Sequence, residues 1–401
     1  MIDRRSLLRA AGAFLTGGAA GAPAAIAQDL AMLPFKNGER PLASYPGKRP
    51  LIRLTSRPPQ LETPFSVFNG GAITPNDAFF VRYHLADIPL SIDPDSFRLT
   101  VAGKVDRPLS LGLKDLKEAF EPVEIVAVAE CSGNSRGFLE PRVAGGQLGN
   151  GAMGNARWRG VALKAILDRA GVQAGARQVA FNGLDRSVFE QTPDFVKALD
   201  IDHAGDGEVM IAYEMNGEEL PWLNGYPVRL VAPGYYATYW VKHLNDIRVV
   251  DDIFDGFWMK KAYRIPDTPC ACTQPGEPAR ATVPINRLNV RSFITSLEDG
   301  AQIAAGADIL VKGIAFDGGY GVSTVLFSSD GGATWLETKL GKDYGRYSFR
   351  EWSLQTRLSA GAHELRVCAI NRIGQTQPMA PLWSPSGYMR NAVERIQVIA
   401  L

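Results

Sequence analysis

Hydrophobic and polar positions repeat with mixed periods over the first part of the chain. Between about residues 71 and 270, short β-prone runs are interleaved with helical stretches. In residues 161–170, for example, apolar side chains recur near a helical period, and Gly171 follows as a probable stop. This alternation predicts a mixed α/β domain over residues 71–270.

The pattern changes after a Pro-rich passage at residues 266–284. Several later segments are short, β-prone and separated by Gly-rich turns, as in an all-β sandwich: residues 308–313, 323–328 and 363–369. We therefore expect an immunoglobulin-like domain over residues 271–401 and an α+β chain overall. A length of 401 residues agrees with two domains. Residues 28–70 show little periodicity and predict an extended N-terminal arm.

The first 27 residues have the pattern of an export signal. Arg4 and Arg5 precede an Ala/Gly-rich apolar stretch that ends in Ala25-Ile26-Ala27, which favours the twin-arginine export machinery and a periplasmic protein exported in folded form. No other apolar run reaches the ~20 residues that a membrane span needs. The formal charge is +1, and about −1 without residues 1–27, so nucleic acid is not an expected partner.

Four cysteines follow the predicted signal: Cys131, Cys270, Cys272 and Cys368. Because a bridge between Cys270 and Cys272 would close a very short loop, we expect two loop thiols, with pairing to Cys368 as an alternative. The sequence contains no C-x-x-C-H run, so this chain is not expected to attach its own c-type haem.

Cys131 ends an apolar run at residues 123–129 and opens a polar loop, Cys131-Ser132-Gly133-Asn134-Ser135-Arg136. A soft thiolate at the carboxyl end of a strand, near a glycine and an arginine, suits a metal or a reactive centre. A buried structural cysteine is the alternative, because free cysteines are among the most buried residues. Upstream, a strand period of two places Arg82 and His84 on one face, either as functional cations or as ordinary hydrogen-bonded residues.

Ordered motifs connect these residues to a known family. They are Phe80-Val81-Arg82-Tyr83-His84, the Cys131 loop, Ala212-Tyr213-Glu214-Met215-Asn216-Gly217, residues 225–234 and Val241-Lys242-His243-Leu244. Together they resemble the sulfite oxidase family of molybdenum enzymes, from about residue 70 to the C-terminus. The resemblance implies a molybdopterin-binding domain followed by a dimerisation-type sandwich.

The resemblance also implies a molybdenum centre with a single pyranopterin dithiolene and Cys131 as the protein ligand. Carried over by position, the cofactor-binding residues are Phe80, Val81, Arg82, Tyr83, His84, Asp185, Asn224, Arg229, Trp240, Val241 and Lys242. Arg229 and Lys242 suit a phosphate. Asn224 stands where family members often have histidine, and it can form hydrogen bonds but carries no charge.

The activity implied by the resemblance is oxygen-atom transfer to sulfite, with sulfate as the product. Arg82, His84 and Arg136 would supply a positive field for the substrate, and Tyr263 stands where the family places an active-site phenol. Animal and plant relatives carry a W-N-x-R-G motif, whereas this chain has Trp383-Ser384-Pro385-Ser386-Gly387. Arg390 would replace the missing cation only if its loop folds back.

The electrons would pass to a c-type cytochrome, which is either a separate protein or a tightly bound haem subunit. A homodimer formed through the C-terminal domain is the alternative to an assembly with a haem subunit. Two further functions remain alternatives: a periplasmic molybdenum reductase of sulfoxides or nitrate, and a non-catalytic anion-binding protein with Cys131 in its core. Bound molybdenum distinguishes the last alternative from both enzymes.

Overall fold

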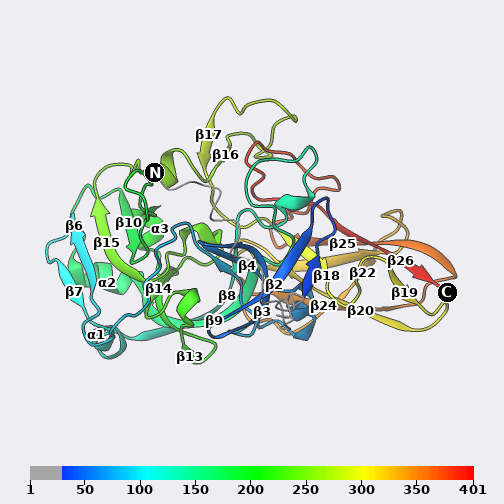
Figure 1. Cartoon of the computed structure of the whole chain (residues 1–401), viewed down its shortest axis with the longest axis horizontal. Helices are drawn as coiled ribbons and strands as arrows, with labels where there is room; N and C mark the ends of the chain where they lie inside the picture. The colour runs from blue at the N-terminus through cyan, green and yellow to red at the C-terminus, as the bar shows by residue number, and fades with distance from the viewer. Residues whose placement is uncertain (1–28) are drawn as a thin grey trace, which may run out of the picture.

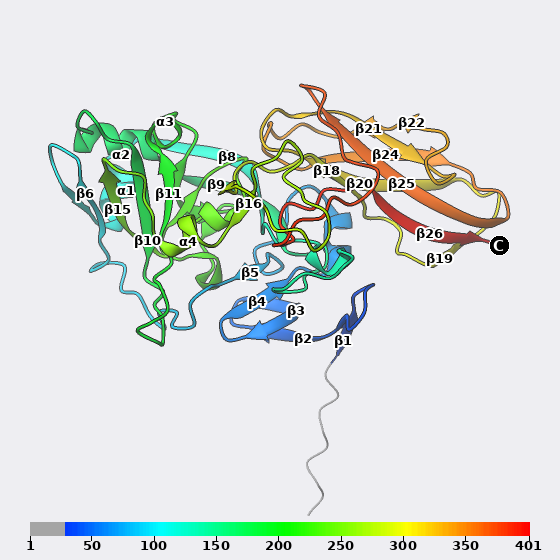
Figure 2. The same cartoon turned by 90° about the horizontal axis from the view of Figure 1, so that it is seen from above.

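The computed structural model describes residues 29–401, so the predicted export signal lies outside the described residues. Figures 1 and 2 show an elongated molecule with the C-terminal strands at one end and the mixed α/β domain at the other. A small N-terminal sheet lies between them. Among the described residues, none of the helices combines the length and apolar content needed to cross a membrane.

The N-terminal segment is a sheet rather than the extended arm that we expected. Five antiparallel strands follow one another in sequence order: β1 (Leu30–Met32), β2 (Glu39–Tyr45), β3 (Lys48–Ser56), β4 (Pro59–Glu62) and β5 (Val81–Arg82). The sequence concealed this because the register shifts between Ala43 and Tyr45 and between Arg53 and Thr55, and each shift interrupts the period of two. The pairing of β4 with β5 places Gln60 opposite Arg82.

Two sheets form the mixed α/β domain. One has the order β11 (Lys197–Asp200), β10 (Gln178–Gly183), β15 (Leu244–Val250), β6 (Leu99–Gly103) and β7 (Leu109–Leu111). The other contains β13 (Glu218–Glu219), β12 (Met210–Met215), β9 (Met153–Ala162) and β8 (Pro122–Glu130), with β14 (Arg229–Val231) paired to β12. Trp158 at the centre of β9 is fully buried in the shared core.

Short helices cover these sheets: α1 (Leu113–Glu118), α2 (Leu163–Ala170), α3 (Ile201–Ala204), α4 (Phe257–Lys260) and the 3-10 turns η2 (Phe65–Gly70), η3 (Arg136–Phe138), η4 (Trp222–Asn224) and η5 (Ala237–Tyr239). Helix α2 confirms the predicted helix, although residues 161 and 162 still belong to β9. Gly171 ends α2 with a φ of 72°, a left-handed conformation that favours glycine.

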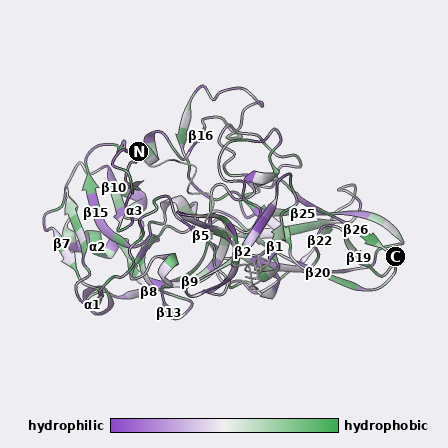
Figure 3. Ribbon diagram, in the orientation of Figure 1, coloured by the Kyte–Doolittle hydropathy of each residue, from purple (hydrophilic) through white to green (hydrophobic). Residues whose placement is uncertain are grey.

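The C-terminal domain is the expected β-sandwich. One sheet has the strand order β18 (Arg291–Ile294), β20 (Ile309–Phe316), β24 (Arg350–Thr356) and β23 (Lys339–Leu340). The other has the order β19 (Ala301–Ile303), β26 (Glu394–Ala400), β25 (Gly361–Asn371), β21 (Val322–Ser328) and β22 (Leu336–Glu337). Hydrophobic and hydrophilic positions both occur along these strands (Figure 3), and the buried set, including Trp352 and Phe327, fills the space between the sheets.

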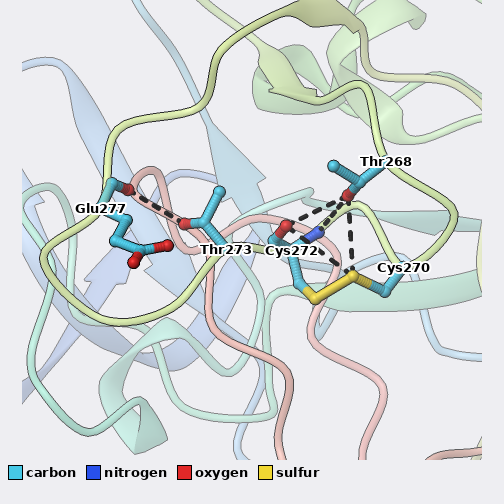
Figure 4. The surroundings of a disulfide bond; sticks show 5 residues. All are labelled: Thr268, Cys270, Cys272, Thr273 and Glu277. Atoms are coloured by element: carbon cyan, nitrogen blue, oxygen red, sulfur yellow. Dashed lines mark hydrogen bonds between the residues drawn. A yellow bond between two sulfur atoms is a disulfide. The ribbon is translucent and has the colours of Figure 1, made fainter.

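The Pro-rich passage forms a loop between β16 (Arg264–Pro266) and β17 (Thr282–Pro284). It contains a disulfide between Cys270 and Cys272 (Figure 4), so the expectation of two loop thiols is wrong. The positive φ of 49° at Ala271 turns the chain, and the two Cα atoms lie 5.1 Å apart, a normal spacing for a disulfide. Cys368 is free and buried on β25.

Replacing both Cys270 and Cys272 by serine is expected to lower the free energy of unfolding by no more than about 1.5 kcal/mol, because a three-residue loop removes little entropy from the unfolded chain. Urea unfolding of the variant and of the wild type, with and without a thiol reductant, measures the loss. A loss several times larger would show that the disulfide has a structural role beyond its own loop.

Candidate active site

Cys131 lies directly after β8, at the meeting point of two cavities. Its backbone N–H donates to the Ala152 carbonyl at 2.9 Å, and its own carbonyl accepts from the Asn134 N–H at 2.8 Å. The side chain is 8% exposed and its thiol is free. Arg82, Ser132 and Tyr263 also line both cavities, so the two spaces adjoin at Cys131.

We call the first space the inner cavity. It is lined by Phe79, Phe80, Arg82, His84, Cys131, Ser132, Phe195, Leu223, Asn224, Arg229, Ala237, Thr238, Trp240, Lys242 and Tyr263. Seven of the residues expected to bind the cofactor thus face one space, although they come from chain segments far apart in sequence. The resemblance therefore selected positions that the fold brings together.

The other expected cofactor residues lie behind this lining. Val81 packs in a small core with Leu51 and Leu61. The Tyr83 hydroxyl donates to His243 Nε2 at 2.7 Å, and His243 Nδ1 donates to the Tyr226 carbonyl.

The Val241 carbonyl accepts from the Leu230 N–H, so this residue contributes through its backbone. Asp185 is buried, which raises the pKa of its carboxyl, while the nearby Lys242 ammonium acts in the opposite direction.

Buried cations gather at one end of the inner cavity. Two Arg229 N–H groups donate to the carbonyls of Asn224 and Trp240, at 2.9 and 3.2 Å, whereas its buried Nε has no partner among the described residues. Lys242 Nζ donates to the Arg82 carbonyl at 2.7 Å. Burial lowers the pKa of Arg229 to about 10 and, together with Arg229, that of Lys242 to about 7. A bound anion would stabilise the charged forms of these two buried side chains.

Lys48 on β3 is a third buried cation that the sequence analysis missed. Its ammonium donates to Asn224 Oδ1 at 2.5 Å and to the Phe79 carbonyl at 3.1 Å, and burial lowers its pKa to about 7. Asn224 Nδ2 in turn donates to the Phe80 carbonyl at 3.1 Å. Asn224 therefore connects Lys48 to the lining of the cavity, and the lysine brings a charge near a position where family members often have histidine.

The second space, which we call the entrance cavity, has a volume of about 350 Å³. Arg136 in η3 lines this cavity. Its guanidinium donates from Nε to the Ser386 carbonyl at 3.0 Å, and its Cζ lies 4.9 Å from the centre of the Tyr388 ring. Arg82 also lines this space. Two guanidinium groups near one thiol make a suitable binding site for a dianion.

The structure does not place Arg390 in this cavity. Its guanidinium pairs with Glu394 at 2.6 Å and lies over the Phe138 ring, so the condition under which Arg390 would replace the missing cation is not met. Arg136 holds the segment at Ser386 instead. The sequence contained no indication of this contact, since 250 residues separate Arg136 from Ser386.

His84 and Tyr263 form a hydrogen-bonded pair between the cavities. The imidazole stacks on the Phe195 ring with centroids 3.8 Å apart, and Nε2 bonds to the Tyr263 hydroxyl. Burial, with Arg82, Lys242 and Lys197 nearby, lowers the pKa of His84 well below its ordinary value. Burial thus favours the neutral imidazole over the positive charge that we expected, and the role of His84 at the site stays a prediction. Burial raises the pKa of Tyr263, which stays protonated.

An ionic network lies beneath the Cys131 loop. Arg291 on β18 donates to Glu130 at 2.6 Å, to Ser135 at 2.8 Å and to Glu394 at 2.9 Å. Asn134 Nδ2 also donates to Glu130 at 3.0 Å. The C-terminal domain thus fixes both sides of the loop that carries the thiol, a contact that no local pattern could predict.

Comparisons with known proteins agree with this geometry. Family models of an oxidoreductase molybdopterin-binding domain and of a Mo-co oxidoreductase dimerisation domain match residues 85–258 and 282–400. Mitochondrial sulfite oxidase of Homo sapiens is 34% identical over 377 residues, which cover 89% of this chain and 67% of the relative. The chain belongs to the sulfite oxidase family.

Other members of the sulfite oxidase family support the assignment. Sulfite oxidase of Arabidopsis thaliana is 30% identical, over 91% of this chain and 98% of its own. Among solved structures, the sulfane dehydrogenase SoxCD from Paracoccus pantotrophus superposes with a TM-score of 0.73 at 25% identity and covers 85% of both chains. The chain is accordingly a sulfite oxidase-type molybdenum oxidoreductase.

The side chains that line the inner cavity are chemically suited to the family's molybdopterin group. Cys131 offers a soft sulfur ligand where the two cavities adjoin. Among residues 29–401, Arg229 Nε and the Ser132 hydroxyl are buried without a hydrogen-bond partner, so both can bind polar atoms of a ligand. At Gly225, with a φ of 112°, an added Cβ would lie 3.0 Å from Arg229 Cβ and 3.2 Å from Lys242 Cα and Cβ, so glycine allows the chain to pass closely behind both cations.

Proposed function

We propose that this protein is a periplasmic sulfite dehydrogenase that oxidises sulfite to sulfate and passes electrons singly to a c-type cytochrome. One observation carries the proposal: the Cys131 thiol stands between a cavity with buried cations and an entrance cavity bordered by Arg82 and Arg136. The first suits an anionic cofactor, and the second suits a small dianion such as sulfite or sulfate.

The side chains of this chain would bind and orient the substrate. Arg82 and Arg136 hold the dianion by charge-assisted hydrogen bonds, and their low-dielectric surroundings strengthen the attraction. When neutral His84 donates from Nε2, the phenolic proton of Tyr263 is available to an oxygen of the anion. The bound molybdenum–pyranopterin group would supply the oxygen-atom transfer and the two-electron redox chemistry.

The acceptor and the compartment are proposed from the sequence. The chain contains no C-x-x-C-H motif, so the electrons need an acceptor with its own redox centre. The paired arginines and the A-x-A site near the N-terminus support export to the periplasm, where c-type cytochromes are suitable one-electron acceptors. Localisation of the full chain by cell fractionation tests the compartment.

Sulfite-dependent reduction of ferric cytochrome c by the molybdenum-loaded protein tests the activity. The assay is run without oxygen, so that oxygen cannot accept the electrons. Rapid reduction supports a sulfite dehydrogenase. If loaded protein leaves cytochrome c oxidised, sulfite oxidation with this acceptor is rejected; reduced viologen with nitrate or a sulfoxide then tests the reductase alternatives.

Replacing Arg82 by methionine is expected to raise the KM for sulfite by roughly 10- to 100-fold, because a charge-assisted hydrogen bond to the dianion is lost. The effect on kcat is expected to be smaller. Steady-state kinetics on the loaded variant measure both constants. Arg357→Met is the matched control, since Arg357 pairs with Asp308 on the protein surface. An unchanged KM would reject the role assigned to Arg82.

A further inference from the structure

Lys197 on β11 is a buried cation that the proposed mechanism does not use. Its side chain is 0% exposed. Nζ donates to the Trp258 carbonyl at 2.7 Å and lies 4.6 Å from the Tyr239 ring centre and 5.2 Å from that of Tyr263. In the described part of the chain, no carboxylate lies within 4.0 Å of this ammonium.

A lysine in this place is costly for stability. Burial of an ammonium without a paired carboxylate carries a large desolvation penalty, which one carbonyl and two ring faces offset only in part. Burial accordingly lowers the pKa of Lys197 to about 7. An apolar residue of similar length would fill the same space more cheaply, so the ammonium points to a role other than stability.

Two of the three contacts of Lys197 lie at the entrance cavity. Trp258 and Tyr263 are both part of its lining, and the Tyr263 ring also stacks on Tyr388, with centroids 5.3 Å apart. The Tyr263 hydroxyl bonds to His84, whose ring stacks on Phe195, two residues before Lys197 in the chain. Lys197 therefore contacts the Tyr263 ring directly, and the nearby Phe195 packs on the imidazole that binds the Tyr263 hydroxyl.

The backbone at Tyr263 needs such support. Its φ of 56° is a left-handed conformation that non-glycine residues seldom adopt, and surrounding contacts must maintain it. A cation near the ring also draws electron density from the phenol, which makes the hydroxyl a stronger hydrogen-bond donor. Orientation and donor strength thus both depend on the same ammonium.

We propose that Lys197 is a positioning residue that fixes the Tyr263 ring and strengthens its hydroxyl as a donor to the anion held by Arg82 and Arg136. The part of this proposal that concerns the anion rests on the proposed function, the oxidation of a sulfur oxyanion. The part that concerns Lys197 and Tyr263 stands on their own contacts. Lys197 itself does not touch the anion.

A double-mutant cycle tests whether Lys197 acts through Tyr263. Lys197→Met keeps the length and removes the charge, and it is expected to lower kcat/KM for sulfite about tenfold, within the range for coupled neighbours. In a Tyr263→Phe background the same substitution is expected to change kcat/KM less than about twofold. Lys197→Arg should recover much of the loss, because it restores the cation. If Lys197→Met lowers kcat/KM by the same factor in the wild type and in the Tyr263→Phe background, the proposal is overturned.

A spectroscopic measurement separates this proposal from the proposed function. Ultraviolet resonance Raman spectra of the wild type minus Tyr263→Phe isolate the Tyr263 doublet, which reports the hydrogen bonding of the phenol. Lys197→Met is expected to shift this doublet, and Lys197→Arg to leave it near the wild-type position. An unshifted doublet in Lys197→Met would overturn the positioning role. If Lys197→Met shifts the doublet but the wild type does not oxidise sulfite, only the proposed function is rejected.

Discussion

Replacement of Cys131 by serine is expected to abolish turnover while the protein stays folded. Loss of residues that only orient a metal ligand typically costs 10- to 100-fold, so loss of the ligand itself should lower kcat by about a thousandfold or more. A serine hydroxyl is a harder donor and remains protonated, so it replaces a thiolate poorly. The fold should tolerate the change, because the two side chains are nearly isosteric.

The same cytochrome c assay measures this loss, and metal and pterin analysis shows whether the variant still holds its cofactor. Cys368→Ser is the matched control: Cys368 is also free and buried, but it lies on β25 in the sandwich, away from both cavities. The control should keep its activity. Wild-type turnover in Cys131→Ser would exclude Cys131 from the mechanism.

Arg291→Met is expected to lower the free energy of unfolding by about 3 to 5 kcal/mol, the usual cost of removing one partner from a buried ion pair. Arg291 is 1% exposed and is bonded to Glu130 and Glu394. Methionine would leave both carboxylates without this partner. Chemical denaturation measures the loss. Arg357→Met, which removes an exposed pair with Asp308, should cost less than about 1 kcal/mol.

The pH dependence of this variant gives an independent check. Burial already raises the pKa of Glu130 and Arg291 opposes that shift, so its removal should raise the pKa further. A folded-state pKa above the unfolded one means that the folded protein binds more protons. The variant should therefore regain stability as the pH falls, and lose it as the pH rises above the unfolded pKa. Glu130→Gln added to Arg291→Met should recover part of the loss and flatten this dependence.

Most of the site residues that the sequence predicted belong to short motifs. Cys131 follows an apolar strand, and the pair Arg82 and His84 lies in one run, so local order made them candidates, and the family resemblance then assigned their roles. The helix at α2 and the sandwich strands were predictable for the same reason, since their periods are regular over several residues.

The missed residues depend on contacts between distant segments. Lys48 and Lys197 are single lysines in unremarkable runs, and only the fold buries them beside Asn224 and Tyr263. The pairing of Glu130 with Arg291 spans 161 residues. Irregular registers concealed the strands of the N-terminal sheet, and the turn at Ala271 allowed a disulfide that the spacing argued against.

The ionic contact beneath the Cys131 loop limits how this enzyme could be re-engineered. Glu130 and Ser135 come from one domain and Arg291 from the other, so an exchange of C-terminal domains between family members would remove the residue that holds the Cys131 loop in place. A working chimera would have to transfer these three residues as a set. The two domains, although distinct in architecture, are not interchangeable modules.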